Sequence, residues 1–264
     1  MTLAKRKSDS QPVCLDRLNT SAAMKLPICR AAFVGNCLAN CIAMCEGIQD
    51  NGRVYRDSDQ TLPRFVERTI DARRKIFRGG EKIDGVLIIC RGWAATVFTL
   101  PNNSRQIVSL LLPGDLVSGA LVFESKLDVS VEAITDVTYH IFDRSEFRTA
   151  LFKNPGLFES ILKIWTEQSL QIVDLAVSLG QCSAEERIAR LVLNLMERLA
   201  LRHMVENHTF HFPLRQWHIA EITGLTPVHV NRVINQLRRD GLIDMRNRSL
   251  TIRDPVALQR ICNI

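Results

Sequence analysis

The sequence contains no apolar run that approaches the roughly 18 residues needed to span a membrane. Its longest uncharged stretch, residues 31–45, is interrupted by two Asn and a Gly. The basic start of the chain is not followed by an apolar segment, which argues against a secretory signal peptide. We therefore expect a cytoplasmic protein without membrane contact, in which the eight cysteines do not form structural disulfides.

The groupings that carry enzyme chemistry are also missing. We find no paired carboxylates, no Ser-His-Asp order and no phosphate-binding glycine loop on suitable elements, so we do not expect an enzyme. Lysine is absent from Cys182 onward, where the chain has 12 Arg and 8 acidic residues. The whole chain carries a net charge of +6. Because the planar arginine side chain matches phosphates and guanine edges better than lysine does, this bias favours a nucleic-acid partner.

The stretch Pro213–Asp240 predicts two short helices around a tight turn. Gly224 is placed to end the first helix, Thr226 to cap the second, and Pro227 to occupy its first position. In the second helix, the residues predicted to face inward are Val230, Val233, Ile234 and Leu237. The predicted DNA contacts on this unit are Thr226, His229, Asn231, Arg232, Asn235 and Arg238. A helical hairpin with a merely polar face is the alternative interpretation.

A predicted hairpin follows this second helix directly. Leu242–Met245 and Ser249–Ile252 alternate as two strands around a polar turn. A hairpin in this place completes a winged helix-turn-helix, with Arg246 and Arg248 at the wing tip as further predicted DNA contacts. The hairpin and the arginine surplus favour DNA binding over the helical-hairpin alternative.

The middle of the chain carries two other patterns. Between Asp71 and Phe147, short β-rich runs alternate with Gly and Pro turns, which is typical of a β-sandwich or jelly-roll barrel. We interpret residues 62–70, just before it, as one short helix. After the barrel, an apolar stripe over 157–179 predicts a long helix. Its members are Ile161, Ile164, Trp165, Ile172, Leu175 and Leu179. We expect this stripe to form a dimer seam, and simple packing on the barrel is the alternative.

The order of barrel, long helix and winged helix-turn-helix resembles the CRP/FNR family of bacterial transcription regulators over residues 62–254. The motifs that carry the resemblance are Arg91-Gly92, Pro113-Gly114-Asp115-Leu116, Ala184-Glu185-Glu186-Arg187, and Gly224-Leu225-Thr226 through Arg232. The resemblance implies an α+β fold with an N-terminal cyclic-nucleotide-binding-like β-roll. It also implies a homodimer on a near-palindromic double-stranded DNA operator, with RNA polymerase as a partner.

This family pattern divides the chain into five parts. We expect a cysteine-bearing extension at 1–60, a sensor β-roll at 61–153 and a dimerisation helix at 154–180. The DNA-binding domain is expected at 181–254, with a tail at 255–264. Within the recognition helix, the family's Arg falls on Arg232 and its base-contacting Glu falls on Val228. His229 and Asn231 therefore become the expected specificity residues, and the operator half-site is expected to differ from the usual one.

The residues that bind a cyclic nucleotide in other family members do not recur here. Gly119 falls at the position of the ribose-binding Glu, and Leu127 and Asp128 fall at the positions of the phosphate-binding Arg-Ser pair. Asp128 would repel a phosphate, and Lys126 offers only one compensating charge. We therefore do not expect cyclic AMP to be the effector.

FNR-type members carry a [4Fe–4S] cluster on N-terminal cysteines, and this resemblance points to Cys37, Cys41 and Cys45. Their spacing differs from the FNR arrangement, and His140 falls at the position of the fourth ligand. Cys29 and Cys90 are other candidates for it. The three cysteines are also spaced to share one helix face as small buried residues, and thiol-redox or haem chemistry stays possible. The rival readings are a redox or metal-binding protein with an incidental helix-turn-helix and a cofactor-free regulator with structural cysteines.

Overall fold

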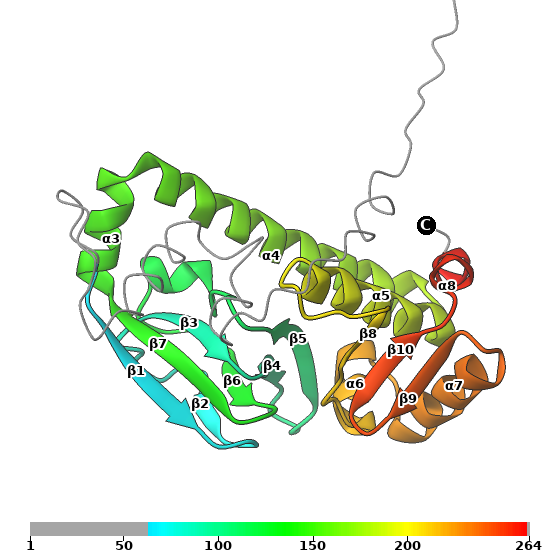
Figure 1. Cartoon of the computed structure of the whole chain (residues 1–264). Coiled ribbons are helices and arrows are strands. Elements are labelled where there is room, and N and C mark those ends of the chain that lie inside the picture. The colour runs from blue at the N-terminus through cyan, green and yellow to red at the C-terminus, as the bar shows by residue number, and fades with distance from the viewer. Residues whose placement is uncertain (1–62, 263–264) are drawn as a thin grey trace, which may run out of the picture.

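A β-roll of two sheets, a long helix and a small C-terminal unit follow one another in the computed structural model, which describes residues 63–262 (Figure 1). One sheet has the order β1-β7-β3, with β1 at Phe65–Ile70, β7 at Val137–Asp143 and β3 at Gly85–Arg91. The other has the order β2-β6-β4-β5, with β2 at Lys75–Phe77, β6 at Ser130–Ala133, β4 at Ala94–Thr99 and β5 at Arg105–Leu111. All strand pairs are antiparallel. A 3₁₀ turn, η1, covers Gly119–Val122.

Residues 65–70 form strand β1, so the short helix predicted over 62–70 is wrong. β1 pairs with β7 along its whole length, from Phe65 opposite Phe142 to Ile70 opposite Val137. As an edge strand it leaves its four central residues exposed, so its sequence lacks the alternation of a half-buried strand. Pairing with β7, a partner far along the chain, decides the conformation here.

Two helices connect the β-roll to the C-terminal unit. Helix α3 covers Arg144–Lys153 and α4 covers Pro155–Gln181. Asn154 separates them, and its side-chain oxygen accepts a hydrogen bond from the N–H of Leu157 at 3.0 Å, which caps α4. Both helices pack on the outer face of the first sheet, where Ile88 and Phe142 lie with them in one core cluster.

Helix α4 has two apolar faces, and the single predicted stripe is divided between them. Ile161 is buried against the β-roll, and Ile164, Leu175 and Leu179 on the same side are half-buried. A second face is exposed to solvent. It comprises Phe158, Leu162, Trp165, Ile172, Val173 and Val177. The sequence pattern predicts one stripe because the two faces lie next to each other on the helix surface.

The C-terminal unit, residues 184–261, combines four helices with a three-stranded sheet. Its helices are α5 at Ala184–Ala200, α6 at Gln216–Thr223, α7 at Pro227–Arg239 and α8 at Pro255–Ile261. The sheet has the order β8-β10-β9, with β8 at Thr209–His211, β10 at Ser249–Ile252 and β9 at Ile243–Arg246. Ser183 and Glu186 form a capping box at the start of α5. Where the sequence predicted only a tail, α8 packs through the buried Leu258 and Cys262.

Within residues 63–262, no helix is both long enough and apolar enough to cross a membrane.

Candidate nucleic-acid interface

The turn between α6 and α7 fixes the angle at which α7 leaves the C-terminal unit. Gly224 has φ of +65°, and a Cβ at this position would lie 2.9 Å from Leu179 Cδ2 of α4. The backbone conformation therefore favours glycine here, and a Cβ would also require the end of the Leu179 side chain to move. Thr226 then caps α7, because its hydroxyl accepts a hydrogen bond from the N–H of His229 at 3.2 Å. Both features were predicted from the sequence and are confirmed.

Helix α7 is buried on one side and open on the other. The four residues predicted to face inward are all buried in the core of the unit, namely Val230, Val233, Ile234 and Leu237. On the opposite side Asn231, Arg232 and Arg238 are exposed, and His229 and Asn235 are half-buried. Val228, which replaces the family's Glu, is 81% exposed at the start of the helix. The helix thus presents a polar surface that the C-terminal unit leaves uncovered.

The polar side chains of this surface are linked to one another. Arg232 Nη2 lies 2.8 Å from His229 Nε2. Asn231 Oδ1 accepts hydrogen bonds from Asn235 Nδ2 at 3.2 Å and from Gln216 Nε2 at 2.9 Å. These contacts restrict the side chains before any partner binds, which lowers the entropy lost on binding.

Gln216 belongs to this surface although the sequence analysis did not select it. It is the first residue of α6, and its side chain reaches the recognition helix across the turn. Its place at a helix N-terminus, where free N–H groups attract phosphate, was the available signal.

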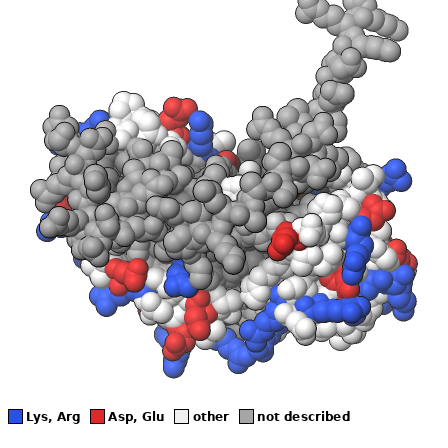
Figure 2. All heavy atoms as spheres, viewed as in Figure 1, with Lys and Arg blue, Asp and Glu red and all other residues white. Residues whose placement is uncertain are grey.

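Strands β9 and β10 form the predicted wing. Arg246 and Ser249 pair at its end, and Asn247 and Arg248 both have positive φ, at 49° and 59°. Two consecutive positive φ angles define a tight hairpin turn, which places Arg248 at the exposed tip. Arg246 is instead paired with Asp244, with Nε 3.1 Å from Oδ2. Arg side chains gather over the lower part of the C-terminal unit in Figure 2.

His218 fixes the start of α6 from the inside. Its Nδ1 accepts a hydrogen bond from the N–H of Arg215 at 2.9 Å, and the side chain is buried. Burial, together with the nearby Arg215 guanidinium, lowers the pKa of His218 to about 4. The imidazole is therefore neutral at pH 7 and serves as a hydrogen-bond acceptor.

An ion-pair cluster joins α6 to the β-roll. Arg105 on β5 binds Glu132 with both Nη atoms, at 3.1 and 2.8 Å, and its Nε lies 3.0 Å from Glu221 on α6. Burial opposes the charged form of Glu132, but the hydrogen bonds from Arg105 keep its pKa below the usual range. Beside this cluster, Gln106 Nε2 donates to the carbonyl of Ile222 at 3.0 Å. The helix-turn-helix is thus held against the second sheet.

Asp115, in one of the motifs noted in the sequence, forms a second connection. Its carboxylate binds Arg202 through one oxygen and Arg198 through the other, the latter at 2.7 Å. Both arginines belong to the segment 184–202, so the turn after β5 is attached to the C-terminal unit. The Arg202 side chain is only 6% exposed, and its Nε donates to the carbonyl of Pro113 at 2.8 Å.

The position of the nucleotide-binding Glu is closed by the long helix. A Cβ at Gly119 would lie 3.3 Å from Trp165 Cγ on α4. Gln168 of the same helix holds this segment by donating to the carbonyl of Leu116 at 2.7 Å. Asp128, where a phosphate-binding residue would stand, is exposed. A longer side chain at residue 119 would have to displace the Trp165 ring.

The three cysteines at 37, 41 and 45 lie outside the described residues, and so does Cys29. His140 is buried on β7 between β1 and β3, with its Nε2 3.1 Å from Glu67 Oε2 and its ring stacked on Phe65 at 4.3 Å. Cys90 is half-buried, with its Sγ 3.7 Å from the carbonyl of Ile88. Residues 63–262 alone contain no group of three or more His, Cys, Asp or Glu arranged to hold a metal.

A β-roll, a long helix with an open apolar face and a winged helix-turn-helix define the class of two-domain transcription regulators. Residues 67–154 match the cyclic nucleotide-binding domain family, and residues 186–261 match the Crp-like helix-turn-helix domain family. The chain is 31% identical to a probable transcriptional activator of Rhizobium leguminosarum bv. viciae, over 74% of this chain and 81% of that protein.

Two other similarities agree with this result. The transcriptional activator protein FnrL of Cereibacter sphaeroides is 29% identical over 69% of this chain and 73% of the relative. The solved structure of FixK2 from Bradyrhizobium japonicum superposes with a TM-score of 0.67 at 22% identity, covering 75% of this chain and 97% of that one. The chain belongs to the CRP/FNR family of transcription regulators and is not an enzyme.

Proposed function

We propose that this regulator is a cytoplasmic homodimer that binds a palindromic double-stranded DNA operator and responds to oxygen or redox state. The observation that carries the DNA-binding part is the uncovered polar face of α7, opposite a face that is wholly buried. An α-helix of this kind fits the major groove, where Arg and Asn side chains can pair with base edges. Because relatives of this chain are named as transcriptional activators, we propose RNA polymerase as a further partner.

The proposed contacts divide into base reading and phosphate binding. His229, Asn231, Arg232 and Asn235 form the linked group on α7, and we assign base contacts to them. We assign phosphate contacts to the residues at the edges of this surface. These are Thr226, Arg238, Arg246 and Arg248. Selection of bound sequences from a library of random palindromic DNA duplexes tests the assignment. Asn231→Ala should change the half-site that the protein selects, whereas Arg238→Ala should leave it unchanged.

The second apolar face of α4 supports a dimer through this helix. Leu162 and Ile172 are exposed on one side of the helix, and Trp165, which contacts Gly119 with one side of its ring, is also 44% exposed there. A two-fold dimer would place the same face of each copy in contact and would remove it from water. Leu162→Glu with Ile172→Glu should produce monomers in sedimentation, whereas Leu170→Glu, off the centre of that face, should leave the dimer intact. A dimer in both variants would exclude this interface.

For the sensor, we propose a [4Fe–4S] cluster held by Cys37, Cys41, Cys45 and His140. When bound, such a cluster supplies an oxygen-labile centre. Glu67 already binds Nε2 of His140, which leaves Nδ1 for a metal, and a carboxylate on the second nitrogen is the usual support of a histidine ligand. This pair of His140 and Glu67 supports His140 as a ligand, and it is the one proposed ligand that the structure describes.

Iron and sulfide analysis of protein purified without air tests the cluster. The proposal predicts about four of each per chain, and serine at any one of the three cysteines should abolish both. His140→Ala should make the cluster labile, whereas Cys182→Ser should have no effect. Iron-free protein with unchanged DNA affinity in air would favour the alternative, a cofactor-free regulator in which the cysteines are structural. The buried contacts of His140 with Glu67 and Phe65 are compatible with that alternative.

A further inference from the structure

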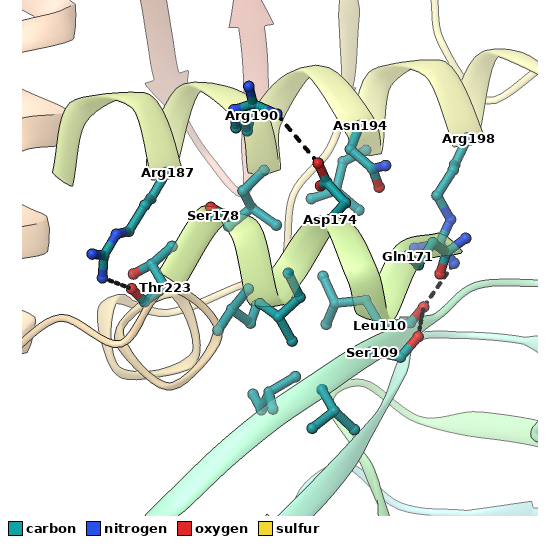
Figure 3. A pocket seen from close by; sticks show the side chains of 16 residues that line it. Ser109, Leu110, Gln171, Asp174, Ser178, Arg187, Arg190, Asn194, Arg198 and Thr223 are labelled. Carbon is teal, nitrogen blue, oxygen red and sulfur yellow. Dashed lines mark hydrogen bonds and ion pairs between the residues drawn. The ribbon is translucent and has the colours of Figure 1, made fainter. Parts of the chain in front are cut away.

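A cavity of about 90 Å³ lies where α4, α5, β5 and the end of α6 meet (Figure 3). One water molecule needs roughly 10–15 Å³ of such space, so the cavity has room for a small molecule. It is separate from both the recognition surface of α7 and the closed position at Gly119. Part of the lining is apolar and comes from Ile107, Leu110, Leu175, Leu191, Leu195 and Ile222.

The polar part of the lining is dominated by arginine. Arg187, Arg190 and Arg198 extend from α5, and among the described residues Asp174 on α4 is the only acidic one in the lining. Arg187 donates to the carbonyls of Leu179, Cys182 and Thr223, which use three of its five N–H groups and carry no charge. Arg198 shares the carboxylate of Asp115 with Arg202. The surroundings of the cavity therefore carry an excess of positive charge.

Arg190 has a donor that lacks an acceptor. Its Nη1 lies 3.2 Å from Asp174 Oδ1, and its Nη2 donates to the carbonyl of Cys262 at 3.1 Å. Its Nε is buried and has no hydrogen-bond partner among the described residues. Leaving such a donor unsatisfied is costly, so a small movement of the partly exposed Arg190 side chain that brings Nε to an acceptor in the cavity would be favourable. Asn194, one turn further along α5, lines the same cavity.

We infer that this cavity is a binding site for a small anion that carries a carboxylate or a phosphate. Arg190 would donate to it after such a movement, and Asn194 would donate through its side-chain amide. The apolar part of the lining would accommodate a short aliphatic group of a carboxylate ligand. Arginine suits both anions because its planar side chain forms paired hydrogen bonds with their oxygens.

The position of the cavity links this site to the arrangement of the protein. Its walls come from the β-roll through Ile107 and Leu110, from the long helix through Gln171 and Leu175, and from the helix-turn-helix through Thr223. A bound anion would add contacts between the elements that border the cavity. We therefore expect binding to stabilise this arrangement, and an effect on DNA affinity would follow only if the proposed function holds.

Calorimetric titration and thermal unfolding of the full-length protein test the site without DNA. The probes are inorganic phosphate and butyrate, each at the ionic strength of a sodium chloride control. We expect one of them to bind saturably and to raise the unfolding temperature. Arg190→Gln should weaken that binding at least about tenfold, the loss expected for one charge-assisted hydrogen bond. Arg260→Gln removes the same charge from an exposed position and should change nothing.

A second variant keeps the test decisive if Arg190→Gln does not fold. Asn194→Leu preserves the side-chain volume closely, removes the amide from the lining and should also weaken binding. Preference for phosphate or for butyrate would separate the two kinds of ligand. If neither anion binds more tightly than chloride, or if binding is equal in wild type and Asn194→Leu, the inference is wrong. Because no step uses DNA, failure here would not affect the proposed function.

Discussion

The C-terminal unit and the β-roll use their polar side chains in opposite ways. On α7, His229, Asn231 and Arg232 face solvent and are linked mainly to one another. On the β-roll, Arg105 and Asp115 are directed at the C-terminal unit itself. The C-terminal unit leaves the polar side chains of α7 free to bind a partner, whereas the β-roll uses its charged side chains to hold the C-terminal unit in place. The position of α7 therefore depends on contacts that the β-roll makes with the C-terminal unit.

Breaking the Asp115 cluster should have the largest effect. Asp115→Asn would leave Arg198 and Arg202 without their carboxylate in a largely buried place. Removing one partner of a buried ion pair typically costs about 3–5 kcal/mol. Urea unfolding should show a loss of this size. The exposed Asp128→Asn is the matched control and should stay within about 0.5 kcal/mol of wild type. A loss below about 1 kcal/mol for Asp115→Asn would mean that the cluster does not hold the domains together.

Acid should weaken the C-terminal unit through His218. Its pKa is about 4 in the folded protein and near 6.5 when unfolded, so the folded state disfavours the charged form. The contribution of His218 is complete above pH 6.5 and is lost as the pH falls toward 4. Each pH unit in this window costs about 1.4 kcal/mol, for a total of about 3 kcal/mol. Urea unfolding at several pH values should show a shallower pH dependence for His218→Gln. If the unfolding free energy of wild type and of His218→Gln depends on pH in the same way, His218 does not cause the loss of stability in acid.

The open surface of α7 should show its effect in DNA affinity rather than stability. Arg232→Ala should weaken binding to the selected palindrome by about 1–3 kcal/mol, because a bidentate base contact is lost. Binding to random duplex should change little, and the unfolding free energy should stay within about 0.5 kcal/mol of wild type. Equal losses on both DNAs would make Arg232 a phosphate contact. Titration by fluorescence anisotropy measures both affinities.

The wing tip should have the smallest effect. Arg248 is exposed on a tight turn, so Arg248→Ala should remove one phosphate contact on any sequence. The slope of log affinity against log salt should then fall by about 0.9 for each lost contact. Arg246→Ala is a useful comparison, because Asp244 already shares the charge of Arg246 and the slope should fall less. A larger change for Arg246 would reverse the two assignments.

The sequence predicted the C-terminal unit well because its signals are local. Gly224, Thr226 and Pro227 act within one turn of the chain, and the inward residues of α7 follow helical spacing. The features it missed depend on distant partners. Strand β1 is defined by β7, and the contact of Gln216 with Asn231 needs the angle between two helices.

The division of α4 into two faces shows the same limit. Ile161 and Ile172 both fit an apolar stripe, and only the packed β-roll decides that the first is buried and the second is 56% exposed. Likewise, Asp115 was visible as part of a turn motif, but its two arginine partners lie more than eighty positions further along the chain. Spacing alone does not reveal such pairings, since they require the complete fold.

We propose that the C-terminal unit binds DNA and that the sensor region responds to redox state and not to a cyclic nucleotide. Affinity of the full-length protein, purified without air, for its selected palindrome tests this most directly. The measurement is made with and without cyclic AMP, and again after exposure to air. We predict no change with cyclic AMP and a loss of at least about tenfold, or 1.4 kcal/mol, in air. A DNA affinity that rises with cyclic AMP and does not change in air would contradict this proposal.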